Sequence, residues 1–583
     1  MKIYKLIFTT LILFLLPAYS YPLTVSLHTS LIKGNVQLKP EDTSVWVPAS
    51  VNMPVLAGNE LWVPKSGTVE LQLSDGTFVR LNENSSLQIL TLDKGSSQFY
   101  LTTGHAYVNF RGRDSILQID TPVSSVRAYD RSKFRIDVSD NGNTEISVFK
   151  GAVYAESRNG KTTVSAGNAL SIGEDFFADL SPLGTPDEWE RWNRERDRKL
   201  VEGRYSHRYL PNELDAYAYD FDENGKWAYT TDYGYVWTPT VLVSAGWAPY
   251  RIGKWVGIGN DYVWVSYEPW GWVPYHYGRW THIVSIGWAW VPPVRGAVYW
   301  GPGFVGWVYT PTYVSWVPLA PGDIYYGHGY YGPNSVNIIN IDIHKTVIKK
   351  VYKNVYINNA VTVVHHDNFV TGKHVGVEIK ENPFLRERLS IGRPQIKPEK
   401  TAFMPIIKEI PKSDQPPQSI RDIKTRELKR ERPLIKEKKA SVLRPKSPQK
   451  TMPIRTLKEP RSLKTRPYME RETAPERQIY KGAKKYIPEM QIKPSEKQKP
   501  EGRIIERQRK TKEPSFEKHP EKSVAPLEKQ RGEPTEGYKE SQPLRKQQRE
   551  DITTGKKGKI EKPSIEKQKG KARSKGRYMQ ELE

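Results

Sequence analysis

Three carboxylates lie in a strongly aromatic stretch of the chain, and their chemistry could be that of a glycosidase. Asp232, Asp261 and Glu268 stand in the region that holds 13 of the 17 tryptophans. A pair of carboxyl groups on either side of an aromatic cleft is how glycoside hydrolases work. Their spacing does not show that two of the three face each other. A glycoside-processing enzyme is therefore only the second alternative among the functions considered below.

Other catalytic signatures are missing from the sequence. The chain contains no cysteine, so it has no thiol nucleophile, thiolate metal site or disulfide. It has no G-x-S-x-G, H-E-x-x-H or phosphate-loop motif either. His365, His366 and His374 lack the spacing of a helical metal-binding pair, and His276 and His282 are expected to make ordinary hydrogen bonds. We expect a protein without enzymatic activity, metal site or cofactor.

A ten-residue phrase occurs twice in the aromatic region. GWAPYRIGKW at residues 246–255 returns as GWVPYHYGRW at residues 271–280, a shift of 25 residues. A fixed period of this length indicates a domain assembled from similar supersecondary units. The frequent proline and glycine residues exclude long helices, and each unit has room for two short strands with turns. We therefore expect residues 215–322 to form a Trp/Tyr-rich repeat of β-hairpins.

Strand alternation assigns the side chains of this phrase to two faces. We expect the tryptophans that frame it to point into the core: Trp247, Trp255, Trp272 and Trp280. The outward face would carry the candidate ligand-binding residues: Tyr250, Lys254, Tyr275, Tyr277 and Arg279. Tyrosine rings beside cationic groups could stack on a glycan or contact a protein partner. The alternative is an ordinary solvated strand face.

The sequence also predicts mainly β structure in the regions around the repeat. Residues 24–175 alternate apolar and polar positions, as in VELQLSDGTFVRL at 69–81 with its Asp-Gly turn, which predicts an antiparallel β roll or sandwich. Residues 185–203 predict a connecting helix that Thr185 caps, with Pro186 at its first position. Residues 323–384 predict a β-hairpin extension or a strand pair that closes the repeat domain. The fold class is therefore all-β, with one connecting helix.

The first β region resembles the FecR domain. The resemblance rests on LSDGTFVRLNENSSLQI, LTTGHAYVNF, IDTPVSSVRAYDRSKFRIDV, ISVFKGAVYAE and VSAGNALSI, in this order. It implies an envelope protein. FecR proteins of the iron-uptake type relay a signal through a cytoplasmic sigma-regulating segment and a membrane span. This chain has a signal-peptide pattern in that place, so direct sigma-factor control is not expected. It also departs from the family's sequence between Ala128 and Phe134. The aromatic repeat is similar to one that follows FecR domains in uncharacterised secreted bacterial proteins.

The first residues have the pattern of a secretory signal peptide. Lys2 and Lys5 precede an apolar run over residues 6–16, and Ala18-Tyr19-Ser20 fits a cleavage site. The apolar run is too short for a comfortable membrane span. We expect residues 1–20 to be removed, no transmembrane segment to remain, and the mature protein to be periplasmic or extracellular.

The charge of +24 is concentrated at the other end of the chain. Residues 391–583 hold 53 Lys and Arg against 28 Asp and Glu. This composition, rich in proline and poor in large apolar residues, predicts that residues 385–583 form a disordered basic tail. Such a tail binds polyanions through counterion release, and the lack of interleaved aromatic residues argues against sequence-specific recognition of nucleic acid. The alternative is a spacer whose charge only maintains solubility.

Together these features predict a non-enzymatic scaffold or interaction protein of the cell envelope, whose cationic tail binds an anionic envelope polymer. The alternative is a glycan- or peptidoglycan-binding module that uses the aromatic repeat.

Overall fold

The computed structural model describes residues 26–460, apart from residues 42, 174–176, 203–204, 241–245, 260, 339–351, 373–381, 386–389, 392–409 and 436–449. The expected signal peptide at residues 1–20 and the tail beyond residue 460 lie outside the described residues. Within the described part, the helices are too short or too polar to cross a membrane. The fold is mostly antiparallel β with few helices, as the sequence predicts.

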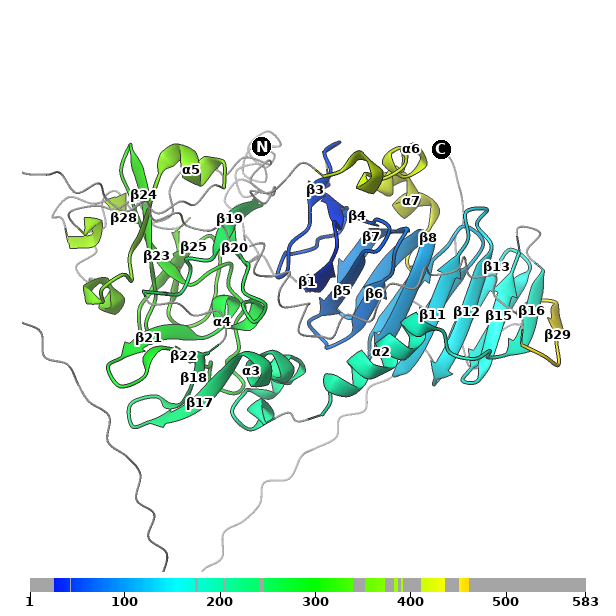
Figure 1. Ribbon diagram of the computed structural model, residues 1–583, viewed down its shortest axis with the longest axis horizontal. Helices are drawn as coiled ribbons and strands as arrows, with labels where there is room; N and C mark the ends of the chain where they lie inside the picture. Colours follow the sequence, from blue (N-terminus) through cyan, green and yellow to red (C-terminus); the bar gives the residue numbers. More distant parts are fainter. Residues whose placement is uncertain are drawn as a thin grey trace, which may run out of the picture. The chain divides into compact units, whose positions relative to one another are not determined.

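Residues 27–182 form a roll of two sheets that share one long strand, β8 (Ser96–Phe110). The first sheet runs in the order β1, β5, β6, β8, β11, β12, β15, β16 (Figure 1). Its remaining strands are β1 (Leu27–Lys33), β5 (Thr68–Leu73), β6 (Phe78–Leu81), β11 (Ser132–Val138), β12 (Thr144–Lys150), β15 (Asn168–Ile172) and β16 (Ala178–Pro182).

The second sheet runs in the order β3, β2, β4, β7, β8, β9, β10, β13, β14, and within it only β8 and β9 pair in parallel. These strands are β2 (Gln37–Lys39), β3 (Val47–Pro48), β4 (Glu60–Val63), β7 (Ser85–Asp93), β9 (Ile116–Asp120), β10 (Ser125–Ala128), β13 (Ala152–Ser157) and β14 (Gly160–Ser165).

Strand β8 passes from one sheet to the other at Gly104. Its first half pairs with β7 and its second half with β6 and β11. Gly104 has a φ of 93°, and a Cβ atom there would collide with Ser85. A glycine is therefore needed where the strand bends between the sheets.

The predicted hairpin at residues 69–81 is confirmed. Strands β5 and β6 meet at the Asp75-Gly76 turn, where the Asp75 carboxylate accepts a hydrogen bond from the backbone N–H of Thr77 at 2.9 Å. Alternate side chains of both strands, such as Val69 and Val79, are buried between the sheets. The period-two pattern thus gives the roll its apolar core.

The connecting helix is α2 (Glu188–Lys199), shorter than the predicted 185–203. Its N-cap is Asp187, whose carboxylate accepts a hydrogen bond from the backbone N–H of Glu190 at 2.7 Å. The prediction that Thr185 caps the helix is therefore wrong by two residues, because the carboxylate at Asp187 satisfies the first free N–H groups. In Figure 1, α2 crosses the outer face of the first sheet.

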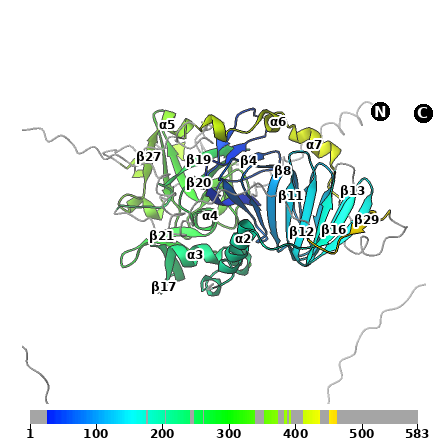
Figure 2. The same ribbon diagram turned by 45° about the vertical axis from the view of Figure 1, so that its right-hand side comes forward.

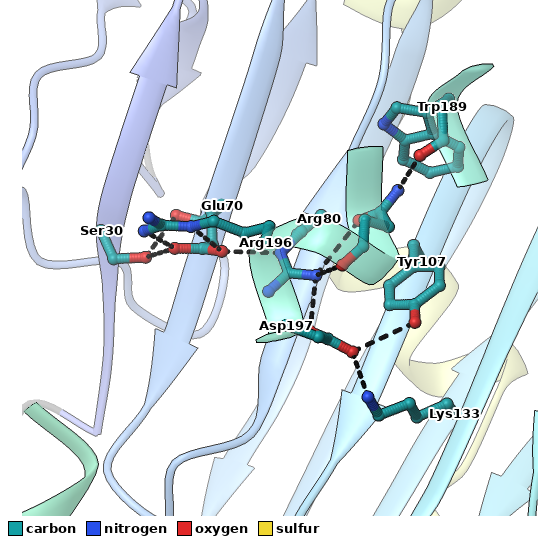
Figure 3. A network of polar contacts seen from close by, with 9 residues as sticks. Ser30, Glu70, Arg80, Tyr107, Lys133, Trp189, Arg196 and Asp197 are labelled. Atoms are coloured by element: carbon teal, nitrogen blue, oxygen red, sulfur yellow. Dashed lines mark hydrogen bonds and ion pairs between the residues drawn. The ribbon is translucent and has the colours of Figure 1, made fainter. Parts of the chain in front are cut away.

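A buried network of charged groups joins α2 to this sheet (Figure 3). Arg80 on β6 contacts Glu70 at 2.6 Å and Asp197 of the helix at 2.8 Å. Arg196 also contacts Glu70 at 2.9 Å, and Lys133 contacts Asp197 at 2.6 Å. Burial alone would raise the pKa of the Glu70 carboxyl, but Arg196 and Arg80 outweigh it and hold that pKa well below its usual range. Because every charge is paired, the network positions the helix without leaving an isolated buried ion.

The aromatic region consists of four consecutive hairpins. Their strands are β17 (Gly225–Thr230) with β18 (Gly234–Pro239), β19 (Gly253–Ile258) with β20 (Asp261–Ser266), β21 (Arg279–Ile283) with β22 (Gly287–Val291), and β23 (Val305–Tyr309) with β24 (Tyr313–Pro318). Strands β18 and β22 also pair, so the first and third hairpins form one four-stranded sheet. Short helices α3 (Ala218–Asn224) and α4 (Trp272–His276) accompany them. Hairpins therefore occupy the region in which the sequence predicts them.

The segment after the repeat differs from the predicted hairpin. Strands β25 (Tyr325–Gly327) and β26 (Ser335–Asn337) pair in parallel, and β27 (Thr362–His365) pairs with β24. Two further elements are α5 (His366–Val370) and β28 (Ser390–Ile391), which pairs with β23. Within residues 323–384, β27 therefore extends the sheet of the fourth hairpin, whereas β25 and β26 form a separate two-stranded sheet. Strand β28 lies beyond this range, in the predicted tail. Part of the predicted strand region, residues 339–351, lies outside the described residues.

Two segments of the predicted disordered tail are ordered against the roll. The first contains α6 (Gln418–Arg421) and α7 (Thr425–Glu431), and the second contains β29 (Ile454–Thr456), which pairs in parallel with β16. Arg455 contacts Asp179 through two hydrogen bonds of 2.8 Å. The prediction of disorder from residue 385 onward is wrong for these segments, because they bury polar and apolar groups against an existing sheet instead of forming a core of their own.

Candidate functional site in the aromatic repeat

Each of the four hairpins places one tryptophan directly opposite another. The four cross-strand pairs are Trp227–Trp237, Trp255–Trp264, Trp280–Trp290 and Trp307–Trp316. Cross-strand aromatic pairs stabilise two-stranded units that have little other core. The repeat is therefore a series of tryptophan-paired hairpins.

A glycine lies two residues before the first tryptophan in three of the hairpins: Gly225, Gly253 and Gly278. A Cβ atom at Gly253 would lie 2.6 Å from the ring of Trp264, and one at Gly278 would lie 2.7 Å from the ring of Trp290. The glycine thus makes room for the ring of the opposite tryptophan. This explains the G-[KR]-W ending of the repeated phrase, of which GKW at residues 225–227 is a third copy.

The tryptophans pack mainly on one another. The ring of Trp255 lies 5.1 Å from that of Trp264 and 4.6 Å from that of Trp307. Trp255, Trp272 and Trp280 are buried and Trp247 is half-buried. The prediction that the framing tryptophans form the core is thus confirmed for three of the four.

The prediction that the residues between them face outward is wrong. Tyr250, Lys254, Tyr275 and Tyr277 are buried, and Arg279 is half-buried with its guanidinium 3.8 Å from the centre of the Phe304 ring. Strand alternation does not apply to most of this phrase. Residues 272–276 form helix α4, and Tyr250 has a φ of 61° in a left-handed turn. Both features turn the tyrosines into the core.

The two equivalent tyrosines of the repeated phrase meet in this core. The hydroxyl of Tyr250 donates to the carbonyl oxygen of Tyr275 at 2.8 Å and accepts from the backbone N–H of Phe304 at 3.0 Å. The indole N–H of Trp316 donates to the carbonyl oxygen of Tyr250 at 2.9 Å. These hydroxyl and indole groups join turns of different hairpins, so Tyr250 and Tyr275, two of the five predicted ligand-binding residues, have a structural role.

Glu268 is the centre of a second buried polar group. Its carboxylate accepts hydrogen bonds from the indole N–H of Trp247 at 2.8 Å, from the hydroxyl of Ser266 at 3.2 Å and from that of Tyr275. Burial raises the pKa of this carboxyl to about 7, against the lowering effect of these hydrogen bonds. The side-chain amide of Asn52, from the roll, donates to the backbone oxygen of Glu268 at 2.6 Å. This carboxyl is enclosed by protein and does not line an open cleft.

The three carboxylates considered for catalysis have three different environments. Asp232 is exposed in the turn between β17 and β18. Asp261 begins β20 and accepts a hydrogen bond from the hydroxyl of Tyr331 at 2.6 Å. Glu268 is buried as described. The arrangement of two carboxylates across an aromatic cleft is therefore absent from their described contacts.

The histidines have structural contacts within the described residues. His276 is buried, its ring stacks on Trp300, and its Nδ1 lies 2.8 Å from the carbonyl oxygen of Gly301. Burial lowers the pKa of His276 to about 4. In the described part of the chain, no three histidine or acidic residues are grouped so that they could hold a metal ion. His374 lies outside the described residues.

One group of aromatic side chains does reach the surface. On the first hairpin, Tyr229 is 70% exposed and Tyr235 is 47% exposed, and their ring centres lie 5.4 Å apart. Tyr209 lies 4.5 Å from Tyr235 and 5.0 Å from Trp227. We call these four residues the hairpin aromatic strip. Sequence reasoning missed it, although the GKW copy at residues 225–227 marks the hairpin.

Comparison with known proteins agrees with this division of the chain. Residues 59–154 match the family described as FecR protein, and residues 218–323 match a family of unknown function (DUF6600). The chain thus carries a FecR domain followed by a second domain of a family without an assigned role. No curated protein matches the sequence significantly.

Two solved structures are similar to part of the chain, both of a proposed anti-sigma factor from Parabacteroides distasonis ATCC 8503, at 1.65 and 2.50 Å resolution. Each has 15% identity and a TM-score of 0.20, and the match covers 21% of this chain and 59% of the other. A similarity this weak gives no indication of function.

Proposed function

We propose that this protein is a non-enzymatic scaffold of the cell envelope, and that its basic C-terminal region binds an anionic envelope polymer. FecR-family proteins are typically associated with the envelope, and residues 59–154 match that family. In the repeat domain, the carboxylate of Glu268 and the side chains of Tyr250 and Tyr275 are engaged in core contacts. This use of polar and aromatic groups supports a structural role for the domain.

The proposal rests on the distribution of positive charge along the sequence. Residues 461–583 hold 34 Lys and Arg against 20 Asp and Glu. Within the described residues, some cations are paired internally, as Arg455 is with Asp179. A region with such an excess of positive charge binds polyanions, and this binding weakens steeply with salt.

The proposal is tested by comparing the full chain with a chain that ends at Pro460 and so keeps both docked segments. We expect the full chain to bind phosphatidylglycerol vesicles at 50 mM salt, and roughly tenfold or more weaker binding at 200 mM. The shortened chain should bind little at either salt concentration. Neutral phosphatidylcholine vesicles are the control. Equal binding by both chains, or binding that does not change with salt, would refute the proposal.

A second candidate function, glycan binding, is favoured by the hairpin aromatic strip. Exposed tyrosine rings beside a tryptophan provide flat surfaces that stack on sugar rings. Soluble peptidoglycan fragments are titrated while the tryptophan fluorescence is followed. The response should disappear in a Tyr229→Ala/Tyr235→Ala variant and persist in Tyr356→Ala, which removes a tyrosine that is 69% exposed and outside the strip. An unchanged response in the double variant would exclude this site.

A further inference from the structure

A segment of the C-terminal region covers the outer face of the second sheet of the roll. We call residues 411–435 the docking segment; it contains α6 and α7. Figure 1 shows these helices next to β4, β7 and β8, and Figure 2 shows them next to β4 and β8. The sheet residues beneath are polar, and yet several of them are buried: Gln37, Lys39, Glu60, Gln98, Gln118 and Asp120. The outer face of a sheet normally leaves such side chains in water.

The first group of contacts holds the start of the docking segment. The side-chain amide of Asn35 donates to the carboxylate of Asp414 at 2.5 Å. The side-chain amide of Gln37 and the indole N–H of Trp62 both donate to the backbone oxygen of Asp414, at 2.5 and 3.1 Å. Three donors from the roll thus converge on one residue of the segment.

The second group holds its middle. The hydroxyl of Thr425 donates to the carboxylate of Glu60 at 2.7 Å, and Lys39 contacts the same oxygen at 2.8 Å. Burial raises the pKa of Glu60, although Lys39 and Thr425 act in the opposite direction. Ile420 of α6 is buried and supplies an apolar anchor.

The third group consists of hydrogen bonds to the backbone at the end of the docking segment. The Gln118 amide donates to the carbonyl oxygen of Pro433 at 3.4 Å, and its oxygen accepts from the N–H of Ile435 at 3.0 Å. Gln98 donates to the carbonyl oxygen of Arg432 at 2.6 Å. Because a side-chain amide both donates and accepts, Gln118 satisfies an N–H and a C=O group of the segment's backbone at once.

These contacts resemble the binding of a peptide more than the packing of a domain. The helices of the segment have four and seven residues, too short to be stable alone in water. The segment has a net charge of +3 from seven Lys and Arg against four Asp and Glu, and many of its charged side chains remain exposed. Its order therefore comes from the sheet face, through three separate sets of contacts.

We propose that this face of the FecR-type roll is a peptide-binding site, and that residues 411–435 are its intramolecular ligand, which dissociates reversibly and can be replaced by the same segment of a second copy. This proposal is independent of the proposed function, because it does not involve residues beyond 460. A linked segment acts at an effective concentration in the millimolar range, so it competes strongly with a free peptide.

The test uses the full chain, a labelled synthetic peptide of residues 411–435 and fluorescence anisotropy. A variant with the docking segment released, Asp414→Ala/Ile420→Asp, should bind the peptide at least about tenfold more tightly than the wild-type chain, whose own segment competes. A peptide that carries the same two substitutions is the matched control and should not bind. Adding Gln37→Ala/Gln118→Ala to the released variant should remove binding of the unmodified peptide.

Two results would overturn the proposal: no binding of the peptide to the released variant, or equal binding to the released and wild-type chains. Hydrogen exchange of the wild-type chain gives a second test that needs no variant. Reversible dissociation predicts that amides in α7 exchange at least about tenfold faster than those in the central strand β11. Equal protection of both elements would show that the segment is a permanent part of the roll.

Discussion

The buried carboxyl of Glu268 predicts a specific pH dependence of stability. Its pKa rises from an ordinary value of 4.5 to about 7 in the folded chain, first because it is buried. A carboxyl whose pKa is higher in the folded state than in the unfolded state keeps its proton to a higher pH in the folded state. Its contribution to stability is complete below pH 4.5 and is lost as the pH rises through 7. At about 1.4 kcal/mol for each pKa step, the loss is about 3 kcal/mol.

The perturbation is Glu268→Gln, which retains a neutral polar group of similar shape and removes the titration. We expect the free energy of unfolding of the wild-type chain to fall, relative to this variant, by about 3 kcal/mol between pH 4.5 and pH 8. Urea unfolding at each pH, followed by tryptophan fluorescence, measures the difference.

The free energy of unfolding of the variant must be subtracted from that of the wild-type chain at each pH, because other buried groups also titrate. Burial lowers the pKa of His28 to about 3 and that of His276 to about 4, so their contributions grow as the pH rises from about 4 to 6.5. These terms are common to both chains and cancel. If the stabilities of wild-type and variant chains change in parallel across this range, the carboxyl is not held protonated and the reasoning fails.

Two further predictions concern packing. Arg80→Ala removes the partner of Glu70 and Asp197 in the network of Figure 3, and should lower the free energy of unfolding by about 3–5 kcal/mol, measured by urea unfolding. A loss below about 1 kcal/mol would show that the network adds little. Gly253→Ala places a Cβ atom 2.6 Å from the Trp264 ring, and should destabilise the chain by about 1–3 kcal/mol in the same assay. Gly184→Ala, where a Cβ atom would approach nothing closer than 3.8 Å, is its control, and equal effects of the two would contradict the explanation of the G-[KR]-W motif.

The strands of the roll could be predicted because their pattern is local. Alternating apolar residues and an Asp-Gly turn specify the β5–β6 hairpin within 13 residues of sequence. Strand alternation predicts the burial of the framing tryptophans correctly where the chain is extended, as at Trp255. It fails at Tyr275 because a short helix interrupts the extended chain there. Whether five residues form a helical turn or a strand depends on their tertiary contacts, and the hydrophobic periodicity of the sequence gives no information about these contacts.

Burial of the polar residues could not be predicted at all. Glu268 and Gln118 are of polar residue types that usually lie at the surface, and each is covered by a part of the chain that is remote in sequence. Asn52 contacts Glu268 across 216 positions, and Ile435 contacts Gln118 across 317. Separations of this size leave no local signal, because neither partner changes the propensity of the residues around the other.

The all-β class, the FecR resemblance, the hairpin repeat and the concentration of basic residues at the C-terminal end can be derived from the sequence, since each depends on composition or on a short-range period. Which faces of these elements are free depends on the tertiary structure. It buries the tyrosines of the repeated phrase, exposes a different aromatic group on the first hairpin, and covers the outer face of the roll with residues 411–435. Exposure is a property of the assembled surfaces, because a side chain is buried by whatever packs against it and not by its own neighbours in sequence.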